Sequence, residues 1–138
     1  MYRVLIVDDE SIMRMMLSTM VDWEELGFEL AHIGINQSDA EEGRRTADAL
    51  CVLFGFESRE TDGSYFVNEQ FEIMKKPFLG ELGHIAIRTT DTERAMAYLR
   101  EKGIGFDEST AGRGDDGRVR VIYFDRDIAG FRFHLAQK

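Results

Sequence analysis

The sequence predicts an α+β fold built from two βαβββ modules, preceded by a shorter strand–helix extension. Two observations predict the modules. A motif that begins at His32 recurs at His84, an offset of 52 residues, and each copy is followed by one helical pattern and three strand patterns. A third observation, a shift in composition near residue 30, separates the extension. We therefore expect an extension over residues 1–30 and one domain over 31–138, with modules at 31–76 and 83–138.

The extension predicts one strand and one helix. Residues 4–7 form a short apolar run rich in β-branched side chains, which is typical of a buried strand. Apolar residues then recur at helical spacing over residues 11–21. The extension carries two arginines against seven acidic residues, so it holds more than half of the net charge of −9.

The run Val-Leu-Ile-Val-Asp-Asp-Glu at residues 4–10 resembles the opening of a response-regulator receiver domain, and residues 22–28 extend the likeness. The resemblance implies that Asp8 and Asp9 would be Mg²⁺ ligands. No strand that ends in an aspartate follows at the expected distance, so we expect no phosphorelay activity. One hypothesis is therefore a chimera, natural or engineered, in which a strand over about residues 28–36 serves both pieces.

Each module is expected to open with an alternating strand and a capped helix. Isoleucines alternate with other residues just after His32 and His84. The helix after each strand is expected to end near a glycine, Gly55 in the first module and Gly103 in the second. The spacing of a capping box precedes both helices, in the pairs Ser38 with Glu41 and Thr90 with Glu93.

Three strands should follow each helix. We expect them at residues 57–60, 64–68 and 70–75 in the first module, and at 107–110, 118–124 and 130–136 in the second. The only proline, Pro77, falls between the modules, where a missing N–H group does least harm.

The doubled module resembles the glyoxalase-like superfamily, also called vicinal oxygen chelate proteins. The stretches that carry the resemblance are Ala-His-Ile-Gly-Ile-Asn at 31–36, Gly-His-Ile-Ala-Ile at 83–87 and Gly-Phe-Arg-Phe-His-Leu at 130–135. It is most similar to the domain appended to bacterial keto-deoxy-phosphogluconate-type aldolases. The resemblance covers about residues 31–138 and implies a glyoxalase/bleomycin-resistance-like fold.

The same resemblance implies a metal site. Metal-binding members take four ligands from the first and last strands of the two modules, and His32, Glu72, His84 and His134 stand at those places. Imidazole and carboxylate groups suit a divalent ion such as Zn²⁺, Ni²⁺, Mn²⁺ or Fe²⁺. Glu72 could also leave the metal and act as a base, which makes it the catalytic candidate. His134 departs from the glutamate that the family often has, and this makes a glyoxalase I reaction less expected.

These residues support a domain that binds, or acts on, a small oxygenated anionic metabolite. If the chain is an enzyme, a metal-dependent lyase, isomerase or dioxygenase is expected; the alternative is a non-catalytic ligand-binding module. Arg88, Arg118 and Arg120 lie on expected strands and could pair with a substrate carboxylate or phosphate. The alternative interpretation is that these arginines only solvate the strand faces.

Composition excludes several partners. A net charge of −9 argues against nucleic acid, and no apolar run approaches the roughly 20 residues of a membrane span. The single cysteine, Cys51, fits a reducing compartment, so we expect a cytoplasmic protein. The free edge of the expected strand at residues 2–7 could pair with a second copy to form a homodimer.

Overall fold

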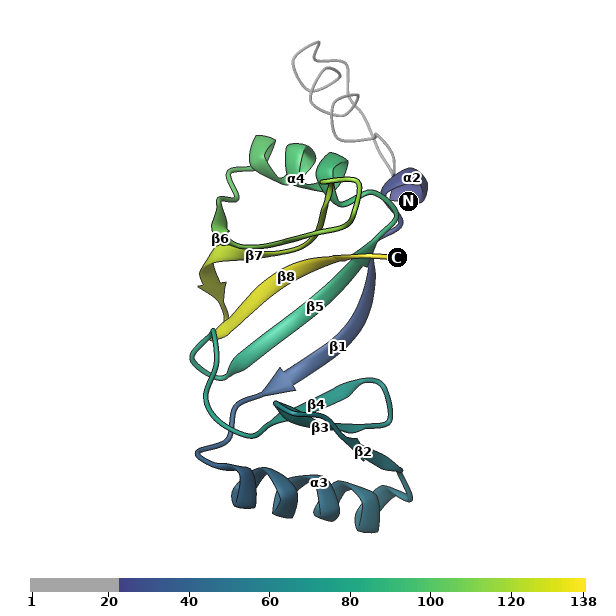
Figure 1. Ribbon diagram of the computed structural model, residues 1–138, viewed down its shortest axis with the longest axis vertical. Helices are drawn as coiled ribbons and strands as arrows, with labels where there is room; N and C mark the ends of the chain where they lie inside the picture. The colour runs from purple at the N-terminus through teal and green to yellow at the C-terminus, as the bar shows by residue number, and fades with distance from the viewer. Residues whose placement is uncertain (1–22) are drawn as a thin grey trace, which may run out of the picture.

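The computed structural model describes residues 23–138 of the chain (Figure 1). The expected strand at 4–7, the expected helix at 11–21 and the pair Asp8 and Asp9 lie outside the described residues. The homodimer contact proposed for the strand at 2–7 lies outside them as well. The boundary between extension and domain at residue 30 therefore stays a prediction. Within residues 23–138, no helix combines the length and the apolar character that crossing a bilayer requires.

Eight strands form one mixed sheet in the order β2-β3-β4-β1-β5-β8-β7-β6. The first module comprises β1 (Glu29–Ile35), α3 (Ala40–Phe54), β2 (Ser58–Glu60), β3 (Ser64–Val67) and β4 (Phe71–Met74). The second comprises β5 (Gly83–Thr89), α4 (Thr92–Glu101), β6 (Phe106–Arg113), β7 (Val119–Ile128) and β8 (Phe131–Gln137). A short helix, α2 (Trp23–Leu26), precedes β1.

The two modules have the same topology. In each, the first strand pairs in parallel with the last, and the remaining neighbours pair antiparallel. β1 and β5 pair antiparallel in the middle of the sheet and join the modules. The predicted α+β fold with paired βαβββ modules is confirmed, and every expected strand of residues 31–138 is present.

The caps of the long helices differ from the predicted pairs by one residue. The carboxylate of Asp39, not the Ser38 hydroxyl, accepts a hydrogen bond from a backbone N–H of α3, that of Glu42 at 2.8 Å. Glu42 in turn accepts from the backbone N–H of Ser38 at 2.8 Å. Asp91 caps α4 in the same way. Each helix is preceded by a hydroxyl residue and then an aspartate, and the charged oxygen is the stronger acceptor.

Each module has its own apolar core between its helix and the sheet (Figure 1). The buried residues of the first core are Ala47, Tyr65, Val67 and Ile73. Those of the second core are Leu26, Ala95, Met96, Val119, Ile122 and Leu135. Since Leu26 belongs to α2, the segment just before β1 packs into the second module.

Candidate metal site

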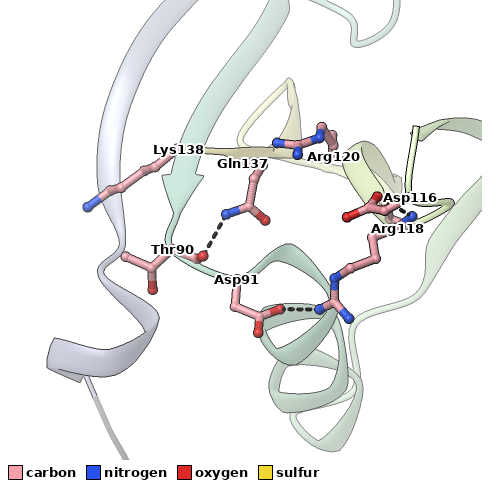
Figure 2. A pocket seen from close by; sticks show the side chains of 8 residues that line it. Thr90, Asp91, Asp116, Arg118, Arg120, Gln137 and Lys138 are labelled. Atoms are coloured by element: carbon pink, nitrogen blue, oxygen red, sulfur yellow. Dashed lines mark hydrogen bonds and ion pairs between the residues drawn. The ribbon is translucent and has the colours of Figure 1, made fainter. Parts of the chain in front are cut away.

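A polar pocket at the N-terminal end of α4 has a volume of about 520 Å³, and its lining includes none of the four predicted ligands (Figure 2). Two of the three candidate arginines, Arg118 and Arg120, lie there. Arg118 donates to the Asp91 carboxylate at 3.1 Å. The third, Arg88, is paired with Glu29 near the end of β5, at 3.4 Å. The structure therefore separates Arg118 and Arg120 from the histidines.

The predicted ligands share one face of the sheet, which we call the open face. Residues opposite one another in paired strands point to the same side. One row across the open face runs through Phe66, Glu72, Gly34, His84 and Arg132. The adjacent row runs through His32, Ala86, His134 and Tyr123. Pairing within and between the modules therefore brings all four predicted ligands side by side.

Small residues at the centre of both rows make room for the imidazole rings. A Cβ atom built on Gly34 would lie 2.1 Å from Cε1 of His84, so that ring occupies the space above the glycine. Ala86 is fully buried in the middle of the other row. The alternation of small residues with histidines on β1 and β5 is what lets the rings converge.

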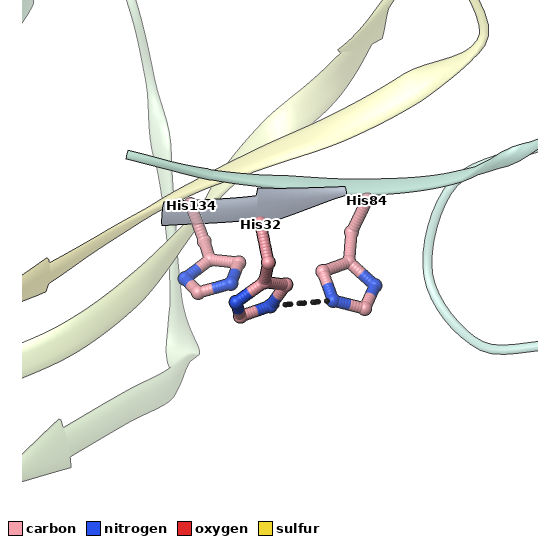
Figure 3. Close-up of side chains that lie close together, drawn as sticks. All are labelled: His32, His84 and His134. Carbon is pink, nitrogen blue, oxygen red and sulfur yellow. Dashed lines mark hydrogen bonds between the residues drawn. The ribbon is translucent and has the colours of Figure 1, made fainter. Parts of the chain in front are cut away.

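The ligating atoms lie close together. The three histidines each offer a ring nitrogen within 4.8 Å of the others (Figure 3). Nε2 of His32 is 3.3 Å from Nε2 of His84. Oε1 of Glu72 is 2.9 Å from Nε2 of His84 and 3.3 Å from Nε2 of His32. Glu72 thus contacts two of the histidines, while the ring of His134 lies 5.5 Å from that of His84 and 5.8 Å from that of His32, between centroids.

This donor set fits a divalent metal ion. Electron-pair donors at such distances repel one another unless a proton or a cation lies among them. Ligand atoms in a tetrahedron around a zinc ion at its usual bond length of about 2.0–2.1 Å are themselves about 3.3–3.4 Å apart. The two contacts of His32 Nε2, each 3.3 Å, have this spacing, while the 2.9 Å contact between Glu72 and His84 is shorter. Nδ1 of His84 is buried without a hydrogen-bond partner, so Nε2 is the nitrogen that this ring contributes to the cluster.

Glu72 is held as a carboxylate. Burial opposes its ionisation, but hydrogen bonds from His32, His84 and Ser64 outweigh burial and hold the pKa of Glu72 well below its usual range. The Ser64 hydroxyl donates to Oε2 at 2.8 Å. A lowered pKa suits a metal ligand or a fixed negative charge, and it weakens Glu72 as a general base near neutral pH.

The buried His134 and the half-buried Tyr123 form an aromatic pair beside the cluster. Their ring centroids are 4.4 Å apart. Burial lowers the pKa of His134 to about 4, so the ring is neutral at pH 7 and keeps a lone pair for a ligand. Burial, aided by the charge of Glu72, raises the pKa of Tyr123 to about 12, so its hydroxyl stays protonated.

Sequence reasoning missed Tyr123, although it faces His134 in the β7–β8 pairing. The signal was present, because Tyr123 lies on an expected strand. Counting residues back from the turn between β7 and β8 does not predict that Tyr123 faces His134, because the pairing register shifts between residues 123 and 127.

No protein-family model matches the chain, and no curated protein sequence matches it. Solved structures do resemble it. Methylmalonyl-CoA epimerase from Mycobacterium tuberculosis is 18% identical with a TM-score of 0.58, over 88% of this chain and 94% of that one. A Streptomyces coelicolor methylmalonyl-CoA epimerase in complex with 2-nitronate-propionyl-CoA is 18% identical with a TM-score of 0.54, over 79% and 96%. A selenomethionine form of methylmalonyl-CoA epimerase is 19% identical with a TM-score of 0.55, over 83% and 97%.

At this level of identity the likeness concerns the fold. The chain has a glyoxalase-like, or vicinal oxygen chelate, fold, and the predicted resemblance is confirmed to that extent. The similar structures give no support to a receiver-like extension or to a chimera.

Proposed function

We propose that the chain binds one divalent metal ion through His32, His84, His134 and Glu72, and uses it to hold a small oxygenated anionic metabolite. The observation that carries the proposal is the convergence of these four side chains from four strands of two modules. One carboxylate and three neutral imidazoles leave a net positive charge around a divalent ion, which favours an anionic ligand.

Isomerisation is the reaction class that we favour over lyase and dioxygenase chemistry, because the similar solved structures are epimerases. A bound metal ion would supply Lewis acidity toward a substrate oxygen. The ring of Tyr123 packs against that of His134, and its protonated hydroxyl would donate a hydrogen bond to a ligand within its reach. Once Nε2 of His32 and His84 binds a metal ion, the Ser64 hydroxyl is the remaining donor to Glu72. Glu72 would then have to leave the metal before it could move a proton.

The second candidate is a non-catalytic binding module. Glu72, the candidate base, would be held by the metal ion through one oxygen, while its other oxygen accepts a hydrogen bond from Ser64. A site whose base is held in this way can bind a ligand without turning it over.

Metal binding is tested first, on tag-free protein stripped with a chelator. Calorimetric titration with Zn²⁺, Ni²⁺, Mn²⁺ and Fe²⁺ should give one ion per chain for at least one metal. At a free concentration 100-fold above Kd, that metal should stabilise the fold by about 2.7 kcal/mol. His84→Ala and Glu72→Gln should weaken binding by at least tenfold. Glu69→Gln, which alters an exposed glutamate of the same hairpin, should not.

Binding well below one ion per chain with every metal, or unchanged binding in His84→Ala, would contradict the proposal. The two candidate functions are then separated in D₂O with the metal-loaded protein and a panel of 2-hydroxy and 2-oxo acids. An isomerase should exchange the C2 proton of a bound 2-hydroxy acid, or a C3 proton of a bound 2-oxo acid, for deuterium, as read by NMR. A binding module should give a thermal shift with the same acid and no exchange.

A further inference from the structure

The connection between the modules, residues 75–82, passes beside the ligand cluster and is fixed there by Asn36. The Asn36 side chain accepts from the backbone N–H of Phe78 at 3.1 Å and donates to the carbonyl of Gly80 at 3.0 Å. Asn36 follows β1 directly, so the strand that carries His32 also sets the position of the connection.

These bonds place the ring of Phe78 beside the candidate site. The centroid of Phe78 is 6.4 Å from that of His84 and 5.9 Å from that of Tyr123, both in edge-on contacts. The Phe78 side chain is nevertheless 49% exposed, so much of it remains free. Phe78 and Tyr123 together form what we call the aromatic wall.

The arginines on the open face are already neutralised. Arg59 pairs with Glu69 at 3.0 Å, Arg88 with Glu29 at 3.4 Å, and Arg132 with Asp127 at 2.7 Å. Their strand positions place each of them on the open face. A phosphate or pyrophosphate group brought to this face would therefore meet arginines that already face a carboxylate, whereas an apolar group meets the exposed ring of Phe78.

We propose that Phe78 determines specificity, so that the site selects a small chelating acid with an apolar, planar arm and rejects phosphorylated acids. This rests on the proposed metal site, which would hold the oxygenated end of the ligand. The arm lies against the aromatic wall, where a ring gains stacking or edge contacts. Asn36 is a positioning residue, because it acts through the connection rather than on the ligand.

The test compares three 2-hydroxy acids that keep the same chelating hydroxyl and carboxylate and differ only beyond them: glycolate, mandelate and 3-phosphoglycerate. Calorimetry on the Zn²⁺-loaded protein should show mandelate binding about tenfold more tightly than glycolate, with 3-phosphoglycerate the weakest. Phe78→Ala should remove the preference for mandelate, because it should lower the affinity for mandelate more than the affinity for glycolate. Asn36→Ala should reduce the preference in the same direction. Phe54→Ala, which removes an exposed ring at the end of α3, is the matched control and should change nothing.

Equal binding of mandelate and glycolate, tighter binding of 3-phosphoglycerate than of mandelate, or a preference for mandelate that survives Phe78→Ala would each overturn the inference. Failure of both acids to bind the Zn²⁺-loaded protein would overturn it as well, and would leave the metal site standing. If Zn²⁺ does not bind but mandelate does, and loses affinity in Phe78→Ala, the metal proposal fails and the role of Phe78 stands.

Discussion

The last strands of the two modules carry equivalent residues with opposite electrostatic behaviour. Glu72 on β4 keeps its negative charge because two histidines and Ser64 donate hydrogen bonds to it. His134 on β8 stays uncharged because it is buried against Tyr123. The repeated topology fixes where the two side chains stand, and the neighbours that differ between the modules fix their charge. A symmetric fold thus holds an asymmetric site.

The modules also differ in how much apolar surface they bury. The last three strands of the first module have 3, 4 and 4 residues, against 8, 10 and 7 in the second. The second core also gains Leu26 from α2, whereas Val52, Leu53 and Phe54 at the end of α3 are largely exposed. We therefore expect the second module to contribute more of the stability.

The largest effect should come from truncating an isoleucine in each core. Ile122 and Ile73 are both fully buried. Ile122→Ala should lower the free energy of unfolding by about 4 kcal/mol, and Ile73→Ala by about 2–3 kcal/mol, because the smaller core relaxes more easily around the cavity. Urea unfolding of the two metal-free variants measures both losses. An equal or larger loss for Ile73→Ala would break the comparison.

Lowering the pH should destabilise the fold, because His134 is uncharged in the folded chain. Its pKa is about 4 in the folded chain and about 6.5 in the unfolded chain. Between these values the unfolded chain binds more protons, so the stability is full above pH 6.5 and falls as the pH drops toward 4, by about 3 kcal/mol in all. Urea unfolding of the metal-free protein at several pH values should show this loss. His134→Gln should remove most of the slope between pH 6.5 and 4; an unchanged slope in that variant would assign it to other groups.

A substitution at Gly34 tests the contact between β1 of the first module and β5 of the second. Gly34→Ala should cost about 2 kcal/mol of stability, because its Cβ would collide with the imidazole of His84. The displaced ring should also weaken metal binding by at least tenfold. Gly63→Ala is the matched control, since nothing lies within 4 Å of the added carbon there. Equal behaviour of the two variants in calorimetry and unfolding would show that the ring has room to move.

The smallest effect is expected at the end of α3. Leu53 is 71% exposed, so Leu53→Gln should change the free energy of unfolding by no more than about 0.5 kcal/mol. The melting temperature of the variant checks this. A larger loss of stability would mean that the end of α3 is covered in solution.

Much of the fold was predictable because the internal repeat indicates two copies of the same series of strands and helices. The motifs at His32 and His84 predict the central strands, and the topology then brings Glu72 and His134 to the same face. The caps were misplaced because hydroxyl and carboxyl residues stand next to each other before each helix. Phe78 escaped prediction for a different reason: the residues between the modules have no periodicity, so no pattern indicates which side chains they bring to the site. Asn36 lies in the motif at residues 31–36, but nothing in that motif indicates that its side chain holds the connection.

The antiparallel pairing of β1 with β5 places His32 and Gly34 against Ala86 and His84. A symmetric dimer that built its site across a two-fold axis would assemble that site only at sufficient protein concentration. Here a short covalent connection links the two halves and sets a fixed effective concentration of one for the other. Assembly of the ligand cluster within one chain is therefore a first-order process that dilution does not weaken.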